Sequence, residues 1–182
     1  MLGNSLTENG RDWCVLLDDT TVCNRGISGD TASGIKERLN QILPGHPRAI
    51  FMMCGTNDIS HGHSAEKVFN MCCDLIDSIR VGSPTTRLYV QSLLPWNDSF
   101  RRWRTIEGRG DDAQLINNML RSYCEQEEIT FINLYPKFTL GDTNQLVKEY
   151  TVDGLHLTQL GYQIWAAQLK PYIEELNAKS PF

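Results

Sequence analysis

Two short segments, near opposite ends of the chain, contain residue types suited to nucleophilic catalysis. Ser5 lies in the segment Gly3–Thr7, directly after the apolar pair Met1 and Leu2 and ahead of apolar residues at helical spacing. A serine on such a strand-to-helix turn is exposed and close to a helix N-terminus, where backbone N–H groups can stabilise an anion. Taken alone, the segment fits a serine that simply caps a helix.

The second segment holds an aspartate three residues before a histidine, Asp153 and His156. In a loop, this spacing lets the carboxylate accept a hydrogen bond from one ring nitrogen of the histidine. The other ring nitrogen then faces a nucleophile, as a serine triad requires. Helix capping is the alternative, because Asp153 or Thr158 can cap a helix predicted for residues 159–176. The two roles are compatible, since a cap also fixes the loop.

Two further segments offer hydrogen-bond donors for a developing negative charge. Gly26 follows a short apolar run, and Asn57 lies in Gly55–Asp58, directly after another. With the N–H of Ser5, these residues supply three donors for an oxyanion hole, where the loss of one donor costs about 3–4 kcal/mol of barrier. In isolation, Gly55–Asp58 fits an ordinary turn.

Short apolar runs alternate with amphipathic stretches along the chain. We predict strands over 20–24, 49–54, 87–94 and 129–134. Four helices are indicated by apolar residues at helical spacing: Ile35, Leu39 and Ile42; Val68 to Ile79; Leu115, Met119 and Leu120; and Ile164 to Ile173. This alternation predicts a parallel sheet covered by helices on both sides. Ligands bind beyond the carboxyl ends of such strands, which is where the candidate residues fall.

In this order, the four segments resemble the four conserved blocks of the SGNH (GDSL-type) hydrolases, over residues 3–162. The resemblance implies an α/β fold: a flavodoxin-like, three-layer α/β/α sandwich with a central parallel sheet of about five strands. It also implies Ser5 as nucleophile, Gly26 and Asn57 as oxyanion donors, and His156 as a base oriented by Asp153.

One position departs from the family pattern, which usually has aspartate before the serine. Here Asn4 keeps the shape and one acceptor without the charge. Residues 91–95 and 153–157 are similar to the branch that includes platelet-activating-factor acetylhydrolase and sugar O-acetylesterases. That branch implies a serine ester hydrolase that removes short acyl groups, above all acetyl, from a carbohydrate through an acyl-enzyme.

Three other functions are weighed against this one. A lysophospholipase or thioesterase would use the same fold and residues. A glycan-binding domain without turnover would have no need of Ser5, Asn57, Asp153 and His156 together. A nucleotide or FMN binder is not supported, because no glycine-rich phosphate-binding motif occurs.

The longest irregular stretch, residues 96–112, mixes arginines with aromatic residues. Aromatic faces suit sugar rings and arginine suits a carboxylate, although a solvated loop with packed aromatics is the alternative. The residues that we expect to contact substrate are Asn4, Arg25, Trp96, Trp103 and Arg104. His61 and His63 lack a further ligand, so we expect no metal and no cofactor.

The composition limits the partners. The chain has 182 residues, 41% of them hydrophobic, and a net charge of −5 without a dense basic stripe, which argues against nucleic acid. No apolar run approaches the roughly 20 residues of a membrane span. We expect one domain over residues 1–182 that binds a small-molecule or carbohydrate ester. A homo-oligomer is compatible with these features.

The start of the chain is unusual, because only Met1 and Leu2 precede Gly3 and strands usually need about 5 residues. We expect an N-terminally shortened chain, with a strand stub at Met1–Leu2 between the strands at 20–24 and 49–54. A structural defect or a partner segment should lie beside the stub. No signal peptide is visible; a removed upstream signal would imply a periplasmic or secreted protein, and otherwise a cytoplasmic one.

Overall fold

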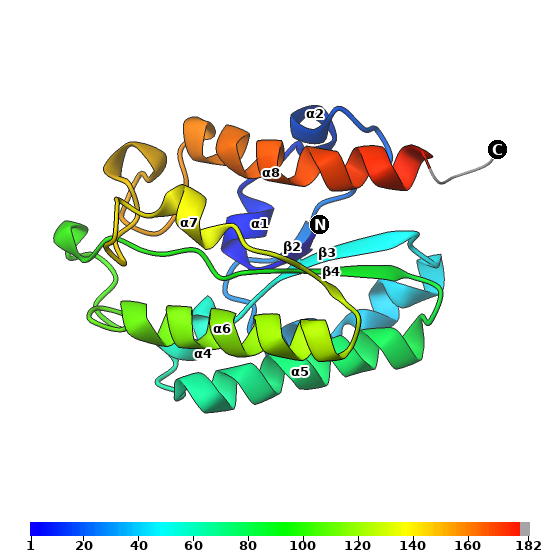
Figure 1. Ribbon diagram of the computed structural model, residues 1–182, viewed down its shortest axis with the longest axis horizontal. Helices are drawn as coiled ribbons and strands as arrows, with labels where there is room; N and C mark the ends of the chain where they lie inside the picture. Colours follow the sequence, from blue (N-terminus) through cyan, green and yellow to red (C-terminus); the bar gives the residue numbers. More distant parts are fainter. Residues whose placement is uncertain (179–182) are drawn as a thin grey trace.

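The computed structural model describes residues 1–178 and is built around a parallel five-stranded sheet (Figure 1). Its order is β2-β1-β3-β4-β5, so the first strand lies inside the sheet as expected. The strands are β1 Leu2–Gly3, β2 Arg25–Gly26, β3 Ala49–Met53, β4 Arg87–Gln91 and β5 Thr130–Ile132. The predicted α/β class with a central parallel sheet of about five strands is confirmed.

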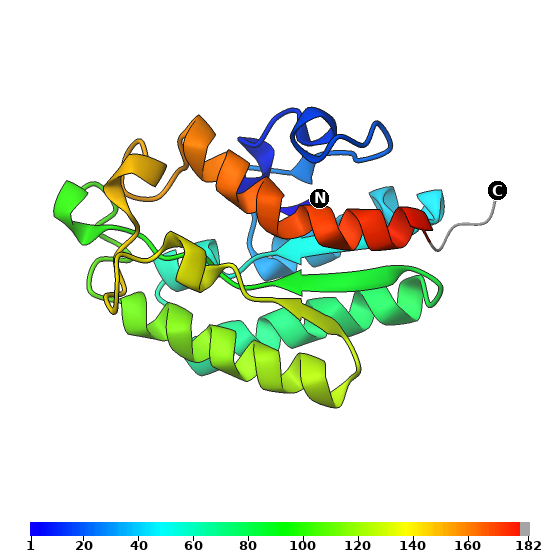
Figure 2. The ribbon, with the colours of Figure 1, turned by 45° about the horizontal axis from the view of Figure 1, so that its top comes forward.

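Helices cover both faces of the sheet (Figures 1 and 2). On one face lie α1 Ser5–Glu8, α2 Trp13–Leu17, α7 Tyr135–Phe138 and α8 Gln159–Ala178. On the other lie α3 Ala32–Glu37, α5 Ala65–Gly82 and α6 Gly110–Gln126. The short α4 Thr56–Ser60 follows β3, and 3₁₀ turns span Leu39–Gln41, Leu43–Gly45, Asp98–Phe100 and Lys148–Tyr150. Within this described part, no helix is long and apolar enough to cross a membrane.

The alternation of side chains along β3 divides the core into two layers. Ile50 and Met52 pack among the residues of α3, α5 and α6. Phe51 and Met53 point to the opposite face, where α8 packs. The Phe51 ring stacks on Tyr89 of β4, with ring centroids 4.4 Å apart. The nearly continuous apolar run in the sequence therefore belongs to a strand buried on both faces.

The strand predicted over 20–24 is wrong in position, because β2 begins at Arg25. A strand forms only where a neighbour offers a ladder, and β1 pairs with Arg25 and Gly26 alone. The preceding residues bond locally instead. Thr21 donates through its N–H and hydroxyl to Asp19, and the Asn24 amide donates to backbone carbonyls of the α1–α2 region.

Two helix predictions also need correction. The helix expected through Ile42 ends at Glu37 and is followed by 3₁₀ turns, the second of which contains Pro44. Leu115 does not face the core: it is 51% exposed, whereas α6 buries Ala113, Ile116, Leu120 and Cys124. The three apolar residues Leu115, Met119 and Leu120 gave too little information to fix which face of this polar helix is buried.

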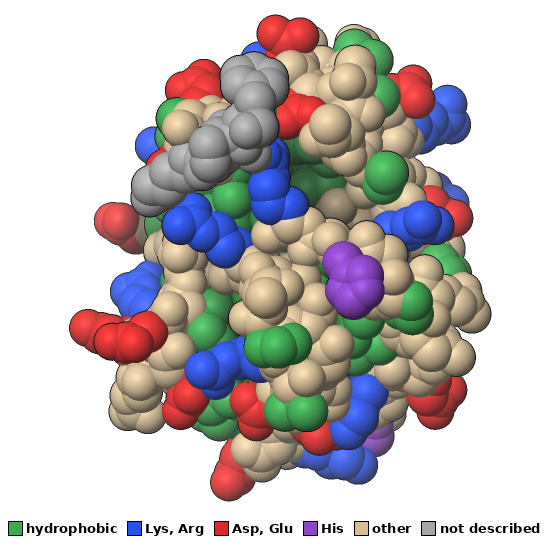
Figure 3. Space-filling model, turned by 90° about the vertical axis from the view of Figure 1, so that its right-hand side faces the viewer, with side chains coloured by type: hydrophobic (Ala, Val, Ile, Leu, Met, Phe, Trp, Pro, Cys, Tyr) green, Lys and Arg blue, Asp and Glu red, His purple; other side chains and the backbone are tan. Residues whose placement is uncertain are grey.

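The strand stub expected at Met1–Leu2 is displaced by one residue, because β1 is Leu2–Gly3, and a cavity lies beside it. β1 reaches only Met52 and Met53 of β3, so the β1-side edge of Ala49–Phe51 lies beside a cavity of about 540 Å³. Its apolar lining includes Met1, Leu2, Ile173 and Leu176. Figure 3 looks onto this side of the molecule, where apolar side chains lie in the floor of a hollow near basic side chains.

Candidate active site

Three side chains from two distant parts of the chain form a continuous line of hydrogen bonds. Ser5 Oγ lies 3.0 Å from His156 Nε2, and His156 Nδ1 lies 2.8 Å from Asp153 Oδ2. With Nδ1–H donating to the carboxylate, Nε2 is the acceptor that faces the serine hydroxyl. This geometry allows the imidazole to take the hydroxyl proton as the oxygen attacks a carbonyl.

A tight turn between β1 and α1 presents Ser5. Asn4 is the N-cap of α1: its Oδ1 accepts the Leu6 N–H at 3.0 Å, and the residue is only 2% exposed. Gly3 is required at the end of β1, because a Cβ there would lie 2.6 Å from the carbonyl oxygen of Met53. Asn4 thus acts as a helix cap, a role that asparagine fills as well as the charged aspartate that the family usually has at this position.

Aromatic side chains support the same turn from behind. Trp13 of α2 donates its indole N–H to the carbonyl of Thr7 at 2.7 Å. Tyr162 of α8 donates its hydroxyl to the carbonyl of Leu6 at 2.7 Å. Both carbonyls belong to α1, which is only four residues long. These tertiary bonds therefore fix a helix too short to be stable alone.

The loop before α8 holds the aspartate and histidine. Asp153 Oδ1 accepts the N–H groups of Leu155 at 3.0 Å and His156 at 2.8 Å, and the residue is 8% exposed. Burial by itself would raise the pKa of Asp153, but the bonds from the His156 ring and the two N–H groups lower the pKa below its usual value. The carboxylate therefore stays charged beside the imidazole at neutral pH.

The three expected oxyanion donors differ in how they are engaged. The N–H of Ser5 meets no acceptor among residues 1–178. One N–H of the Asn57 amide donates to the carbonyl of Asp30 at 2.8 Å, which orients the group and leaves its second N–H available. The N–H of Gly26, however, already donates to Asn24 Oδ1 at 3.0 Å.

Gly26 has a structural role that the sequence did not reveal. A Cβ at this position would lie 2.2 Å from the backbone nitrogen of Glu8, so the glycine allows β2 to approach α1. Gly29 was overlooked. It has φ +84°, open space at its Cβ position, and an N–H without an acceptor in the described chain. Its place two residues before the helix cap Thr31, in a turn-forming segment, is the signal in the sequence that points to it.

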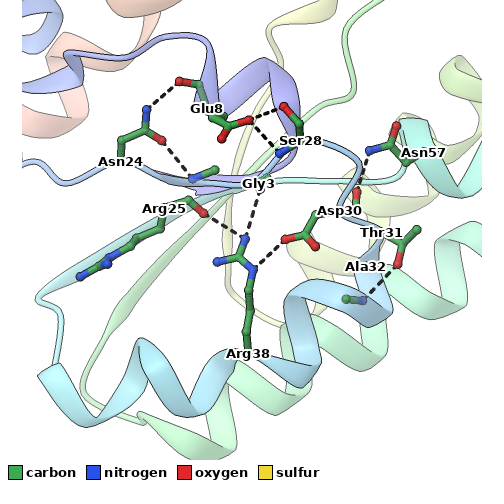
Figure 4. A network of polar contacts seen from close by, with 12 residues as sticks. Gly3, Glu8, Asn24, Arg25, Ser28, Asp30, Thr31, Ala32, Arg38 and Asn57 are labelled. Carbon is green, nitrogen blue, oxygen red and sulfur yellow. Dashed lines mark hydrogen bonds and ion pairs between the residues drawn. The ribbon is translucent and has the colours of Figure 1, made fainter.

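Only one of the remaining substrate candidates lies against the triad. The Trp103 ring meets the His156 ring edge-on, with centroids 5.1 Å apart. Arg104 is exposed and forms no hydrogen bond or ion pair with the residues that the structure describes. Trp96 is buried in the core. Arg25 lines the 540 Å³ cavity and points away from Asn57 (Figure 4).

The segment with the two neighbouring histidines is held by an arginine of the long loop. Arg109 donates to the carbonyls of Ile59 and His63, both at 2.6 Å, and pairs with Asp112 at 2.6 Å. Across residues 1–178, no group of three or more His, Cys, Asp or Glu side chains is placed to hold a metal ion. Arg109 therefore fixes this part of the structure.

Residues 1–164 match the profile of the GDSL-like lipase/acylhydrolase family. The chain belongs to this family. Among solved structures, this GDSL-like acylhydrolase is similar to a GDSL-like lipase from Bacteroides thetaiotaomicron, with 26% identity, a TM-score of 0.85 and coverage of 96% of this chain and 86% of that one. An acetyl xylan esterase shares the fold at 18% identity, with a TM-score of 0.76 and coverage of 94% and 97%.

Two groups of curated proteins also resemble this GDSL-like acylhydrolase. An N-acylneuraminate cytidylyltransferase of Streptococcus agalactiae is 28% identical over 85% of this chain. The human platelet-activating factor acetylhydrolase IB subunit alpha1 is 26% identical over 82% of it. The chain spans only 35% of the first protein and 62% of the second. The family is described as one of lipases and acylhydrolases, which narrows the chemistry without naming a substrate.

Proposed function

We propose that this protein is a serine ester hydrolase that removes short acyl groups, acetyl above all, from a carbohydrate. The hydrogen-bonded line from Ser5 through His156 to Asp153 is the observation that carries the proposal. Ser5 Oγ attacks the ester carbonyl while His156 Nε2 takes its proton. The same proton then goes to the leaving alkoxide, and Asp153 stabilises the imidazolium formed between the two steps.

Water then cleaves the acyl-enzyme, and the proton transfers through His156 run in the opposite direction. His156 takes a proton from the water as its oxygen attacks the acyl carbon, and returns it to Ser5 as the acyl group leaves as a carboxylic acid. In both steps the carbonyl oxygen becomes negative. We assign its stabilisation to the N–H groups of Ser5 and Gly29 and the side-chain amide of Asn57. Gly29 replaces Gly26 here because the Gly26 N–H is engaged by Asn24.

Two observations favour a short acyl group on a sugar. The Trp103 ring beside His156 is suited to stacking on a sugar. Among the similar proteins, two are named as an acetylhydrolase and an acetyl xylan esterase, and one is named for an acylated sugar acid.

The proposal is tested with matched p-nitrophenyl esters and a panel of acetylated sugars. The acetate ester should be hydrolysed with a higher kcat/KM than the octanoate ester. Acetate release should be faster from an acetylated sugar than from p-nitrophenyl acetate at equal concentration. Preference for octanoate would instead indicate a thioesterase or lysophospholipase. Binding of glycans without any hydrolysis would identify a glycan-binding domain.

A further inference from the structure

Arg38, the residue that follows α3, lies at the centre of a polar network outside the triad (Figure 4). Its Nε pairs with Asp30 Oδ2 at 2.7 Å. Its Nη2 donates to the carbonyl of Arg25 at 3.0 Å and to the carbonyl of Gly3 at 3.3 Å. One guanidinium therefore contacts β1, β2 and the loop between β2 and α3.

Two of these three contacts, those with Gly3 and Asp30, lie close to the proposed oxyanion donors. Gly3 is two residues before Ser5, whose N–H is the first donor. Asp30 follows Gly29, the second donor. The carbonyl of Asp30 also accepts from the Asn57 amide, the third donor, at 2.8 Å. Arg38 itself touches none of the three donors, but it bonds Gly3, two residues before Ser5, and Asp30, which follows Gly29 and accepts from Asn57.

The chemistry of the guanidinium explains why an arginine stands here. Its planar group offers five N–H donors in fixed directions, so it can serve a carboxylate and two carbonyls together. The side chains of Arg38 and Asp30 are only 12% and 15% exposed, which limits competition from water. A lysine could keep the ion pair with Asp30, but its flexible ammonium could not reproduce this set of directions.

The opposite side of the same loop is held independently. The Glu8 carboxylate accepts the N–H of Ser28 at 2.9 Å and also the Ser28 hydroxyl. Gly29 thus lies between Ser28, fixed by α1, and Asp30, fixed by Arg38. Loss of Arg38 would free only one side of the loop. The loop should then remain folded while the direction of the Gly29 N–H and the Asn57 amide becomes less well defined.

We infer that Arg38 is a positioning residue for the oxyanion hole, aligning the donors of Ser5, Gly29 and Asn57 without touching substrate. The inference rests on the proposed function. It predicts a loss of transition-state stabilisation with little change in substrate binding, because small misplacements of donors cost up to about 10²-fold in rate. The triad bonds among Ser5, His156 and Asp153 should stay intact.

The experiment compares Arg38→Gln, Arg38→Lys and Asp30→Asn with a matched control, Lys36→Gln, in the last turn of α3. Lys36 forms an exposed ion pair with Asp74 at 2.6 Å. Melting temperature, kcat and KM are measured for each variant with p-nitrophenyl acetate. The rate with the corresponding thionoester is measured in parallel, because sulfur is a weak acceptor and gains little from an oxyanion hole.

For Arg38→Gln we expect kcat for the ester to fall about 10- to 100-fold with KM changed less than about threefold. The ratio of ester to thionoester rates should fall by a similar factor, whereas Lys36→Gln should leave it unchanged. Arg38→Lys should recover melting temperature more fully than it recovers this ratio. The ratio does not depend on the fraction of folded enzyme, so it remains informative for a destabilised variant.

An unchanged ester-to-thionoester ratio in Arg38→Gln and Asp30→Asn would overturn the positioning role, whatever their melting temperatures. Full recovery of the ratio by lysine would also overturn it, since charge alone would then suffice. Failure of the proposed function has a different signature. In that case wild-type hydrolysis would be absent or would persist in Ser5→Ala.

Discussion

The two ends of β1 differ in how completely the surrounding chain is hydrogen-bonded and packed. At the carboxyl end, Gly3 is followed by a capped turn, and its carbonyl accepts from Arg38. At the amino end, the β1-side edge of Ala49–Phe51 borders an apolar cavity of about 540 Å³. The short β1 therefore places the nucleophile at one end and borders the cavity at the other. Changes at the carboxyl end should affect turnover, and changes at the amino end should affect stability.

The largest effect is expected from the triad itself. Ser5→Ala and His156→Ala should each lower kcat by on the order of 10⁵-fold, and the double variant should be little worse because the residues act as a unit. Melting temperatures should change little. Ser78→Ala on α5, whose hydroxyl bonds only within its own helix, is the matched control. Additive losses in the double variant would contradict a shared mechanism.

Asp153→Asn should cost less turnover than removal of either of the other two residues. The amide keeps most of the shape but favours the wrong imidazole tautomer and cannot stabilise the imidazolium, so kcat should fall about 10³- to 10⁴-fold. Steady-state kinetics at neutral pH measure this loss. A variant that retained wild-type kcat would remove Asp153 from the mechanism.

A stabilising change at the amino end would sharpen the contrast. An extension of about five β-branched residues placed before Met1 should fill the cavity and pair with Ala49–Phe51. The melting temperature should rise by about 2–4 °C for each kcal/mol gained, with kcat unchanged. An extension of glycine and serine of equal length is the control. Equal melting temperatures for the two extensions would show that the cavity does not accept a strand.

The smallest expected effect is on the pH dependence of stability. The folded-state pKa of Asp153 is lowered, so its ionised form stabilises the fold above the unfolded pKa of about 3.9. That contribution is lost as pH falls through the lower folded-state pKa. The difference in unfolding free energy between wild type and Asp153→Asn should therefore shrink on acidification below about pH 4. Chemical denaturation at several pH values measures it, and a constant difference would contradict the assigned interactions.

Much of the fold could be predicted because its signals are local. The apolar run of β3 and the periodic apolar residues of α5 each reveal their element within a short stretch of sequence, because the pattern of apolar residues follows which side chains are buried. The segments containing Ser5, Asn57 and His156 also lie where the alternation of strands and helices predicts. By contrast, the position of β2 depends on where β1 begins, so the apolar character of residues 20–24 was misleading.

The rest of the candidate site depends on tertiary hydrogen bonds that the sequence does not display. Gly26 and Gly29 stand in the same segment, but α1 blocks the Cβ position of Gly26 and Asn24 accepts its N–H, whereas Gly29 has φ +84° and open space at its Cβ position. Arg38 lies inside the helix predicted through Ile42, and an arginine there is expected to face solvent. Its importance emerges only when the carbonyls of Gly3 and Arg25 are seen to converge on it.

The central claim, that Ser5 is the nucleophile activated by His156, is tested most directly by covalent labelling with a fluorophosphonate ester followed by intact-mass and peptide mass spectrometry. The account predicts one adduct per chain, located on Ser5. The adduct should be absent in Ser5→Ala, much slower to form in His156→Ala, and unaffected in Ser78→Ala. Labelling of a different residue, or hydrolysis of p-nitrophenyl acetate that continues after complete labelling of Ser5, would contradict it.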